Sequence, residues 1–387
     1  MDEGGKRMGT KLFKTVMALC MLLSLLTVTA FADVNQETRD TKGYGGVDLP
    51  ARPDTSTDIW TVTPDNAQYT LDGAYGSIDG KTICFSAGTY EDVLVLGRAS
   101  KFTGSGTKYY SDNWTTGAAY ENLQNSGVYR YSRAVENVTF TAEDGVVLPG
   151  FTASSGHKYG TTGAPVYDYV RETSTESTGG SYYAAATLKG LVFDGLTISG
   201  GVYINDYLEN SLTDGITFTG CTFQGDTAQM ATNGFCGIGM KADTKNFKNV
   251  TVANCTFTNY FQGIYVQAPE NWTIQNCTFY NTTHNAIALQ SSTKNVAAGT
   301  ITLKENIIQN AHDRAVRLNN AENAVIVLEN NVMLNSGDSD GQLIKAETLT
   351  NTTVALDYNY WDGKAASTAV AGSLTQPAVT GIRGGTF

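Results

Sequence analysis

Apolar and polar residues alternate in many short segments of the chain, and these segments recur at a nearly regular spacing. Three of them read ITFTGCTFQG (216–225), VTVANCTFTN (250–259) and WTIQNCTFYN (272–281). Each has an alternating half, a one-residue bend and a second short alternating half. Period-two alternation with β-branched residues predicts strands, and we find no extended amphipathic segment of period 3.6.

The unit continues on both sides of these three segments. Aligned on the bend, it gives one marked position per repeat, with spacings of 25, 34, 22, 29, 25 and 28 residues. A further strand lies between several units: GIGMKA (237–242), GIYVQA (263–268), AIALQS (286–291) and AVRLNN (315–320). Three short strands per repeat of this length predict a parallel β-solenoid, in which stacked turns bury an apolar face that no single turn could bury.

Stacking in register places equivalent side chains above one another. We therefore interpret the marked position as a structural ladder of small buried cysteines followed by asparagines that bond to one another. Parallel cysteine side chains lie alongside each other, which argues against a disulfide between neighbours. The ladder comprises Leu196, Cys221, Cys255, Cys277, Asn306, Asn331 and Asn359.

The repeated "xI-x-N-x-I-x-N … GI-x-L" unit resembles the right-handed parallel β-helix of the pectin-lyase-like superfamily. FSAGTYEDVLVL (85–96) resembles the strand that opens many such helices, and DYNYWDG (357–363) resembles their closing turn. The predicted fold class is therefore all-β, a right-handed parallel β-helix over residues 80–365. A leucine-rich horseshoe lacks its repeat here, and an antiparallel sandwich would not repeat so evenly.

The remaining segments have different compositions. Basic residues precede an apolar run from about 16 to 30 and a small-x-small pattern ending at Ala32, so residues 1–32 are predicted to be a cleaved secretory signal. This predicts a secreted or cell-surface protein, of bacterial type, with no membrane span after cleavage. We assign residues 33–79 to an N-terminal lead or cap and 366–387 to a C-terminal tail or linker.

Two loops interrupt the repeat, at about 104–135 and 152–186, and they hold ten of the 21 tyrosines. These tyrosines either pack the loops against the helix or offer an aromatic platform for sugar rings. The net charge of −11 argues against a nucleic-acid partner, because such a partner requires a basic surface.

The resemblance implies a sugar cleft along the outer face of the GI-x-L strands and the turn before it. Polar and cationic residues follow this line in an otherwise acidic chain. The candidate substrate-binding residues are Lys241, Tyr265, Gln267, Gln290, Asn319, His284, His312 and Arg314, with Gln262, Asn285 and Glu347 nearby.

A uronate lyase needs a base that removes the proton next to the carboxylate, and a cation that neutralises that carboxylate. Arg317, Lys345 and Asp313 are the catalytic candidates for this chemistry. Asp313, Asp338 and Asp340 are the candidate ligands of a calcium ion. The alternative interpretation of Arg317 and Asp313 is a surface ion pair.

A hydrolase interpretation has less support. The polygalacturonases of this fold carry aspartates where this chain has Phe235-Cys236 and Phe261-Gln262, and Arg317-Leu318-Asn319 matches only the arginine of their last motif. No GxSxG nucleophile motif occurs. The three histidines, at 157, 284 and 312, lack the spacing of a zinc site.

The sequence therefore predicts a β-helix that binds polysaccharide along its outer sheet face, as an adhesin-like protein does. The alternatives are a polysaccharide lyase, a less favoured glycoside hydrolase and a purely structural spacer. Whether the protein is an enzyme is left open by the sequence.

Overall fold

The computed structural model describes residues 50–71, 75–97, 134–154, 156–158, 183–185, 187–206, 212–242, 246–292, 295–373 and 379–380. The predicted signal and most of both predicted loops, including nine of their ten tyrosines, lie outside these ranges. None of the described helices is long and apolar enough to cross a membrane.

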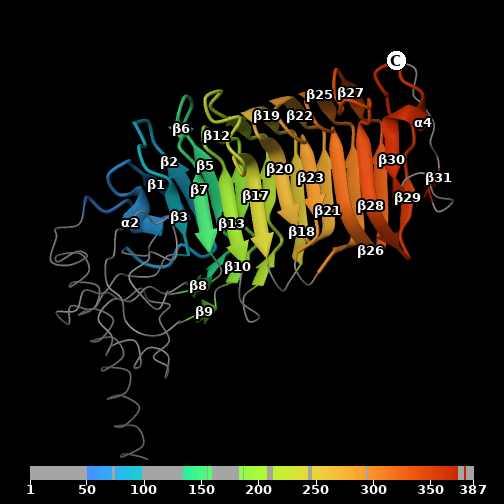
Figure 1. The fold of residues 1–387 in the computed structure, drawn as a ribbon. Helices are drawn as coiled ribbons and strands as arrows, with labels where there is room; N and C mark the ends of the chain where they lie inside the picture. The colour runs from blue at the N-terminus through green and yellow to red at the C-terminus, as the bar shows by residue number, and fades with distance from the viewer. Residues whose placement is uncertain are drawn as a thin grey trace, which may run out of the picture.

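The described chain winds into stacked coils of parallel strands, and the coils follow one another in sequence order along the solenoid (Figure 1). Each complete coil contributes a strand to three faces, which we call A, B and C. Face A consists of β3 (Leu94–Leu96), β7 (Phe151–Ser154), β13 (Val202–Asp206), β17 (Cys236–Ala242), β20 (Gln262–Gln267), β23 (Ile287–Gln290), the first half of β26 (Val316–Glu329), β28 (Ile344–Thr350) and β30 (Val370–Gly372).

Face B follows face A in each coil, and the two are parts of one hydrogen-bonded sheet because β26 runs through both. Its strands are β1 (Ile59–Val62), β2 (Thr82–Phe85), β5 (Thr139–Ala142), β11 (Val192–Asp194), β15 (Thr217–Thr219), β18 (Phe247–Ala253), β21 (Pro269–Gln275), β24 (Ala297–Lys304), the second half of β26, β29 (Thr353–Ala355) and β31 (Val379–Thr380). The short strands β4 (Val135–Glu136), β10 (Thr187–Lys189) and β14 (Leu212–Asp214) stack beside them and lead into β18.

Face C is a separate seven-stranded sheet. It consists of β6 (Val147–Leu148), β12 (Thr197–Ile198), β16 (Thr222–Gln224), β19 (Thr256–Tyr260), β22 (Thr278–Thr282), β25 (Ile307–Ala311) and β27 (Val332–Leu334). One described pair, β8 (Gly156–Lys158) with β9 (Tyr183–Ala185), is antiparallel and leaves the coil pattern. The predicted all-β parallel β-helix is thus confirmed.

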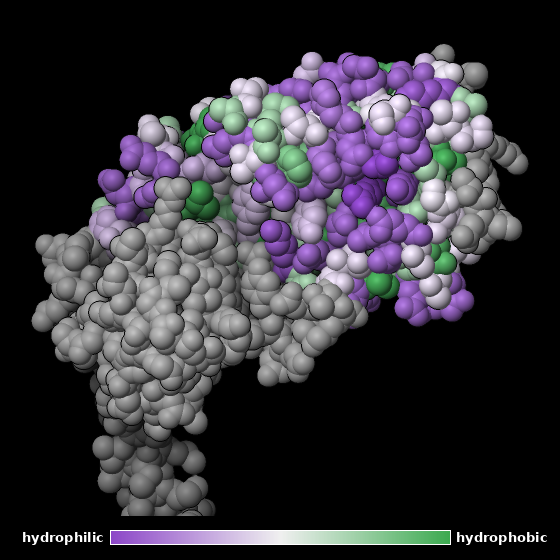
Figure 2. All heavy atoms as spheres, in the orientation of Figure 1, coloured by the Kyte–Doolittle hydropathy of each residue, from purple (hydrophilic) through white to green (hydrophobic). Residues whose placement is uncertain are grey.

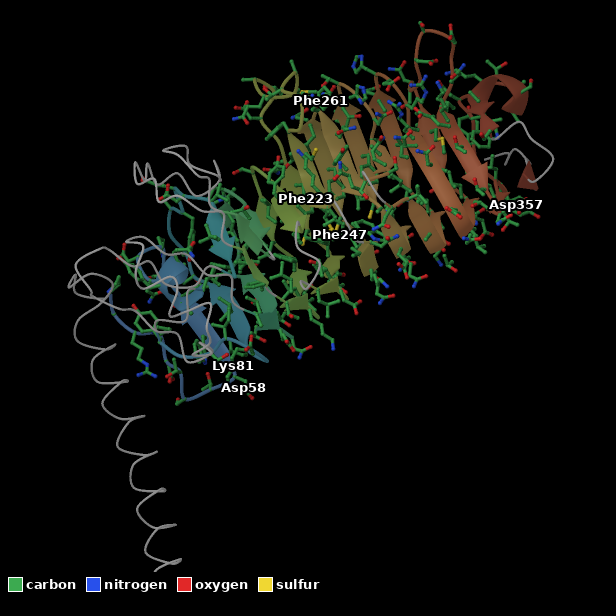
Figure 3. All side chains as sticks on the ribbon, turned by 60° about the horizontal axis from the view of Figure 1, so that its bottom comes forward. Asp58, Lys81, Phe223, Phe247, Phe261 and Asp357 are labelled. Atoms are coloured by element: carbon green, nitrogen blue, oxygen red, sulfur yellow. The ribbon has the colours of Figure 1, made fainter. Side chains whose placement is uncertain are left out.

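The interior is filled by side chains that stack at the strand spacing. Phe223, Phe257 and Phe279 of face C form one column, with ring centroids 4.6 and 4.7 Å apart and nearly parallel planes. Figure 3 marks Phe223 within the body of the solenoid. These distances match the spacing of neighbouring strands, about 4.8 Å, because each ring occupies the same position of its coil.

The phenylalanine column explains the glycine that opens the GI-x-L strands. A Cβ on Gly237 would lie 2.6 Å from Phe257 Cδ1, and a Cβ on Gly263 would lie 2.6 Å from Phe279 Cδ1. The ring of face C therefore packs against the backbone of face A, and only glycine leaves room for it.

The bend between faces B and C contains one residue with left-handed backbone geometry in every coil from Gly195 onward. Its φ is +62° at Gly220, +55° at Asn254 and +51° at Asn276. Glycine and asparagine adopt this conformation with little strain, which explains their presence at most of these bends, and Glu305 and Tyr358 adopt it in two later coils.

The next residue at each bend points inward and forms the ladder. Asn306 Nδ2 donates to Asn331 Oδ1, and Asn331 Nδ2 donates to Asn359 Oδ1, both at 2.9 Å. Each Oδ1 also accepts a backbone N–H from the preceding coil, for example that of Cys277 at 3.0 Å from Asn306. The three amides are fully buried and bonded, and the cysteines at the equivalent positions are buried free thiols.

The solenoid extends beyond the predicted range of 80–365 at both ends. Strand β1 pairs in register with β2, so a first coil begins before residue 80. After residue 365, helix α4 (Ala366–Ala369) precedes β30 and β31, which pair with β28 and β29. The interpretation of this segment as a free tail or linker is corrected by this pairing.

The first strand of face A is protected at its open edge by a side chain. Gln68, in helix α2 (Ala67–Leu71), donates to the Val95 carbonyl at 3.0 Å and accepts from the Val95 N–H at 2.8 Å. One glutamine amide thus provides both hydrogen bonds that a neighbouring strand would provide, which blocks edge-to-edge pairing there.

Candidate functional site: face A and the turn before it

The outward positions of face A form a line of polar side chains across neighbouring coils. The inward positions, Ile238, Ile264, Ile287 and Val316, are fully buried and aligned with one another. Lys241 and Glu347 are exposed, and the partly exposed residues on the line are Tyr265, Gln267, Gln290, Arg317, Asn319 and Lys345.

At two positions that strand alternation predicts to face outward, no polar side chain reaches the solvent. Ala288 is fully buried, in register between Tyr265 and Arg317. Gly239 is buried as well, and a Cβ there would lie 2.8 Å from the ring of Tyr203. The register of β26 and β28 also places Lys345 directly beside Arg317.

The charged groups of face A are paired differently from the expected ion pair. Arg317 Nη2 bonds Glu347 Oε1 at 2.5 Å, whereas Asp313 is paired with Arg314. Lys241 Nζ lies 5.9 Å from the ring centroid of Tyr265. Among the described residues, neither Lys345 nor Lys241 has an ion pair or a side-chain hydrogen bond, and Lys345 also has no ring contact.

The turn that connects faces C and A carries a connected set of polar side chains, which we call the turn network. Arg314 Nη2 bonds Asp338 Oδ2 at 2.5 Å, and its other Nη pairs with Asp313. His284 Nε2 lies 3.4 Å from Asp313 Oδ2, and its Nδ1 lies 3.4 Å from the amide nitrogen of Gln262. Polar contacts therefore run through four successive coils.

Two atoms of the turn network are buried without a partner among the described residues. They are Asn285 Oδ1 and Arg314 Nε. The amide nitrogen of Asn285 lies 2.5 Å from His284 Nδ1. Buried polar atoms are nearly always bonded in folded proteins, so these two atoms are exceptions within the described residues.

His284 is held in its neutral form by its surroundings. Burial lowers the pKa of its imidazole below the usual 6.5, and Arg317 and Arg314 lower it further, against the opposing effect of Asp313. The ring stacks on Phe261, with centroids 4.9 Å apart. Figure 3 marks Phe261 at the edge of the solenoid. Amide N–H donors face Nδ1, so the proton of the neutral ring lies on Nε2, toward Asp313.

We expect His284 to make the stability of the protein depend on pH. Because its pKa is lower in the folded state, its contribution is complete above about pH 6.5 and is lost as the pH falls through the folded pKa. Chemical unfolding of the wild type and of His284→Gln at neutral and mildly acidic pH tests this. The wild type should lose more stability on acidification, and an equal loss in both proteins would contradict the assignment.

The structure does not gather the proposed calcium ligands. Arg314 binds both Asp313 and Asp338, and Asp338 Oδ1 accepts the backbone N–H groups of Asp340 and Gln342 at 3.0 and 2.9 Å. Within the described part of the chain, no group of three His, Cys, Asp or Glu side chains is placed to hold a metal ion.

Several residues near the site were not recognised from sequence. Phe261 stacks on His284, and Gln342 lies 3.5 Å from Arg314. An aromatic residue in the turn before GI-x-L was the available signal for Phe261. Cys236 lies behind the turn, where burial raises the pKa of its thiol to about 12, so it is not a nucleophile at neutral pH.

His312 does not join the turn network, although it lies next to Asp313. Its side chain is exposed and has no bonded partner among the described residues, and it borders a groove on the face C side of the turn. The side chain of His157 lies outside the described residues. Hydrophilic residues cover most of the visible surface over the C-terminal coils (Figure 2).

Comparison with known proteins supports the fold. Residues 179–355 match the family model described as a right handed beta helix region. The chain is therefore a right-handed parallel β-helix repeat protein with a pectin-lyase-like fold. No curated protein and no solved structure matches the chain.

Proposed function

We propose that this protein binds an acidic polysaccharide along face A. The observation that carries the proposal is a local line of cations on a chain with a net charge of −11. Lys345 is free beside the Arg317–Glu347 pair, and Lys241 lies over Tyr265. A carboxylate-bearing polymer would find an unpaired ammonium group here, whereas most of the protein repels it.

The geometry of a β-helix suits an extended polymer. Neighbouring strands repeat at about 4.8 Å, so side chains at equivalent positions present contacts at regular intervals along the solenoid axis. Gln267, Gln290 and Asn319 supply amide donors and acceptors, and the half-buried ring of Tyr265 supplies an apolar surface for a sugar ring. The secretory pattern of residues 1–32 supports a role outside the cell, where such polymers occur.

A substitution of the free lysine tests this proposal. Lys345→Ala should weaken binding to polygalacturonate or alginate about three- to tenfold, because it removes an unpaired cation from the contact surface. Lys304→Ala is the matched control, since Lys304 is a partly exposed lysine on β24 of face B. Affinity electrophoresis at low and high salt measures both variants.

The wild type should bind less tightly at high salt, because contacts between exposed charges are screened. Equal retention of wild type and Lys345→Ala, or an equal loss in Lys304→Ala, would contradict binding at face A. Binding to neutral polymers alone would contradict the acidic ligand.

The second candidate function is a uronate lyase, and the free Lys345 beside Arg317 favours it over a hydrolase. Arg317 is engaged by Glu347, so Lys345, in its neutral amine form, is the better placed group to accept a proton. To test for lyase activity, the protein is incubated with the same polymers, with and without calcium. The absorbance of newly formed unsaturated chain ends is followed over time. A rise that Lys345→Ala abolishes would support a lyase, and no rise would leave binding as the function.

A further inference from the structure

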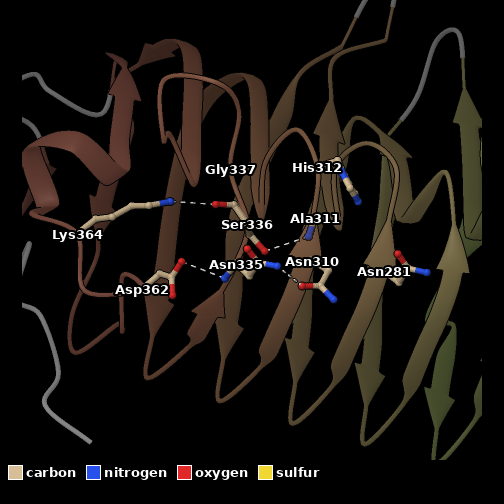
Figure 4. A pocket seen from close by; sticks show the side chains of 9 residues that line it. All are labelled: Asn281, Asn310, Ala311, His312, Asn335, Ser336, Gly337, Asp362 and Lys364. Carbon is tan, nitrogen blue, oxygen red and sulfur yellow. Dashed lines mark hydrogen bonds between the residues drawn. The ribbon is translucent and has the colours of Figure 1, made fainter.

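A groove of 610 Å³ lies along the turn from face C toward face A (Figure 4). This volume falls within the range of small-molecule sites, about 300–1,000 Å³. The groove is lined mainly by polar side chains from successive coils, and it is separate from the outward line of face A. Its lining includes Asn281, Asn310, His312, Asn335, Asp362 and Lys364.

The asparagines of this groove belong to a second ladder, at the end of the face C strands. Asn281 Nδ2 donates to Asn259 Oδ1 at 2.7 Å, and Asn335 Nδ2 donates to Asn310 Oδ1 at 2.7 Å. All four residues have positive φ, between 45° and 65°, so the same corner geometry repeats in each coil.

The ladder is interrupted between Asn281 and Asn310, although their strands are neighbours in register. Continuing the pattern would require Asn310 Nδ2 to donate to Asn281 Oδ1, but neither atom has a bonded partner among the described residues. In Figure 4 the Asn310 amide nitrogen and the Asn281 oxygen face the space between the two coils. The interruption leaves one donor and one acceptor unused at the floor of the groove.

The imidazole of His312 lies above the same interruption and is also unbonded in the described structure (Figure 4). At the other end of the groove, the polar side chains of Asp362 and Lys364 already have hydrogen-bond partners. Asp362 Oδ2 accepts the Asn335 N–H at 3.0 Å, and Lys364 Nζ donates to the Ser336 carbonyl at 3.0 Å. The unused hydrogen-bonding groups are thus concentrated at Asn281, Asn310 and His312.

We propose that this interruption is a binding site for a neutral sugar. A pair of adjacent hydroxyls has the complementary chemistry, because one can donate to Asn281 Oδ1 while the other accepts from Asn310 Nδ2. His312 provides a further polar contact above them. The site goes beyond the acidic polymer on face A, since its contacts are hydrogen bonds between uncharged groups and its residues face a different surface.

Calorimetric titration of the protein with neutral hexasaccharides of glucose, mannose and xylose tests the proposal. Asn310→Gly and Asn281→Gly remove the amides while glycine retains the positive φ. Each should weaken binding about three- to tenfold, the effect of losing one or two hydrogen bonds. His312→Ala, which changes an exposed side chain, should weaken it as well and does not threaten folding.

Asn323→Gly is the matched control, because Asn323 has φ of +52° and accepts a hydrogen bond from Asn351 at another corner. Three results together support the site. Binding is lost in the groove variants, it is retained in Asn323→Gly and Lys345→Ala, and it changes little with salt concentration. The proposal is overturned if no hexasaccharide binds, or if binding depends on Lys345 and not on Asn310. Failure here leaves the acidic-polymer proposal intact, because that proposal is measured with other ligands and variants.

Discussion

Replacing Asn331 with leucine is expected to lower the free energy of unfolding by about 3–5 kcal/mol, because it leaves several buried groups unbonded. The Asn306 backbone N–H and side-chain amide both donate to Asn331 Oδ1, at 3.1 and 2.9 Å. The Leu303 carbonyl accepts from Asn331 Nδ2 at 2.9 Å. None of these groups can reach water instead, since the ladder is fully buried.

The same substitution at a partly exposed amide provides the control. Asn320 donates to Ser291 Oγ at 3.1 Å and is accessible to solvent, so Asn320→Leu should change stability by less than about 1 kcal/mol. Denaturant unfolding followed by far-ultraviolet circular dichroism compares the two. Similar midpoints for both variants would show that the buried ladder has no special role in stability.

Replacing Phe257 with alanine is expected to destabilise the protein by about 3–5 kcal/mol through the cavity it creates. Phe257 is the central ring of its column, so the loss removes both stacking contacts, with Phe223 and Phe279. It also removes the ring that packs on Gly237. Because each coil contacts only its neighbours, the damage should concentrate in the coils on either side.

Hydrogen exchange can locate this effect as well as measure its size. Protection should fall most in β16, β19 and β22, and least in the distant strands β1 and β2. Phe257→Leu, which retains most of the apolar volume, should be destabilised less than Phe257→Ala. A uniform loss of protection along the whole solenoid, or equal effects of both substitutions, would contradict the proposed role of the column.

The fold was predictable because the repeat expresses a simple physical requirement. Isoleucine in GI-x-L strands recurs at one inward position, and the structure aligns Ile238, Ile264 and Ile287 in neighbouring strands. Alternation therefore identified both the strands and their register. Segments with too little alternation were assigned incorrectly, as the three-residue strand β30 illustrates.

The candidate site was less predictable because ion pairs depend on the neighbouring coil. Arg317 and Asp313 are close in sequence, but they lie on different sides of the point where the turn becomes a strand. Arg317 consequently meets Glu347, thirty residues away, and Asp313 meets Arg314. The interruption of the second asparagine ladder was also invisible in sequence, because Asn281 and Asn310 occupy the expected positions and only their side-chain orientations differ.

The three corners of the coil differ in how freely they accommodate extra residues. The corner between faces B and C retains its single left-handed residue at Gly220, Asn254 and Asn276, whatever the length of the coil. Extra residues enter the other two corners instead. Residues 225–235 lie between β16 of face C and β17 of face A, and residues 97–134 and 155–186 lie between strands of face A and the strands beside face B. New peptide segments should therefore be accepted at the two corners on either side of face A, which makes those corners the natural places to graft binding loops onto this scaffold.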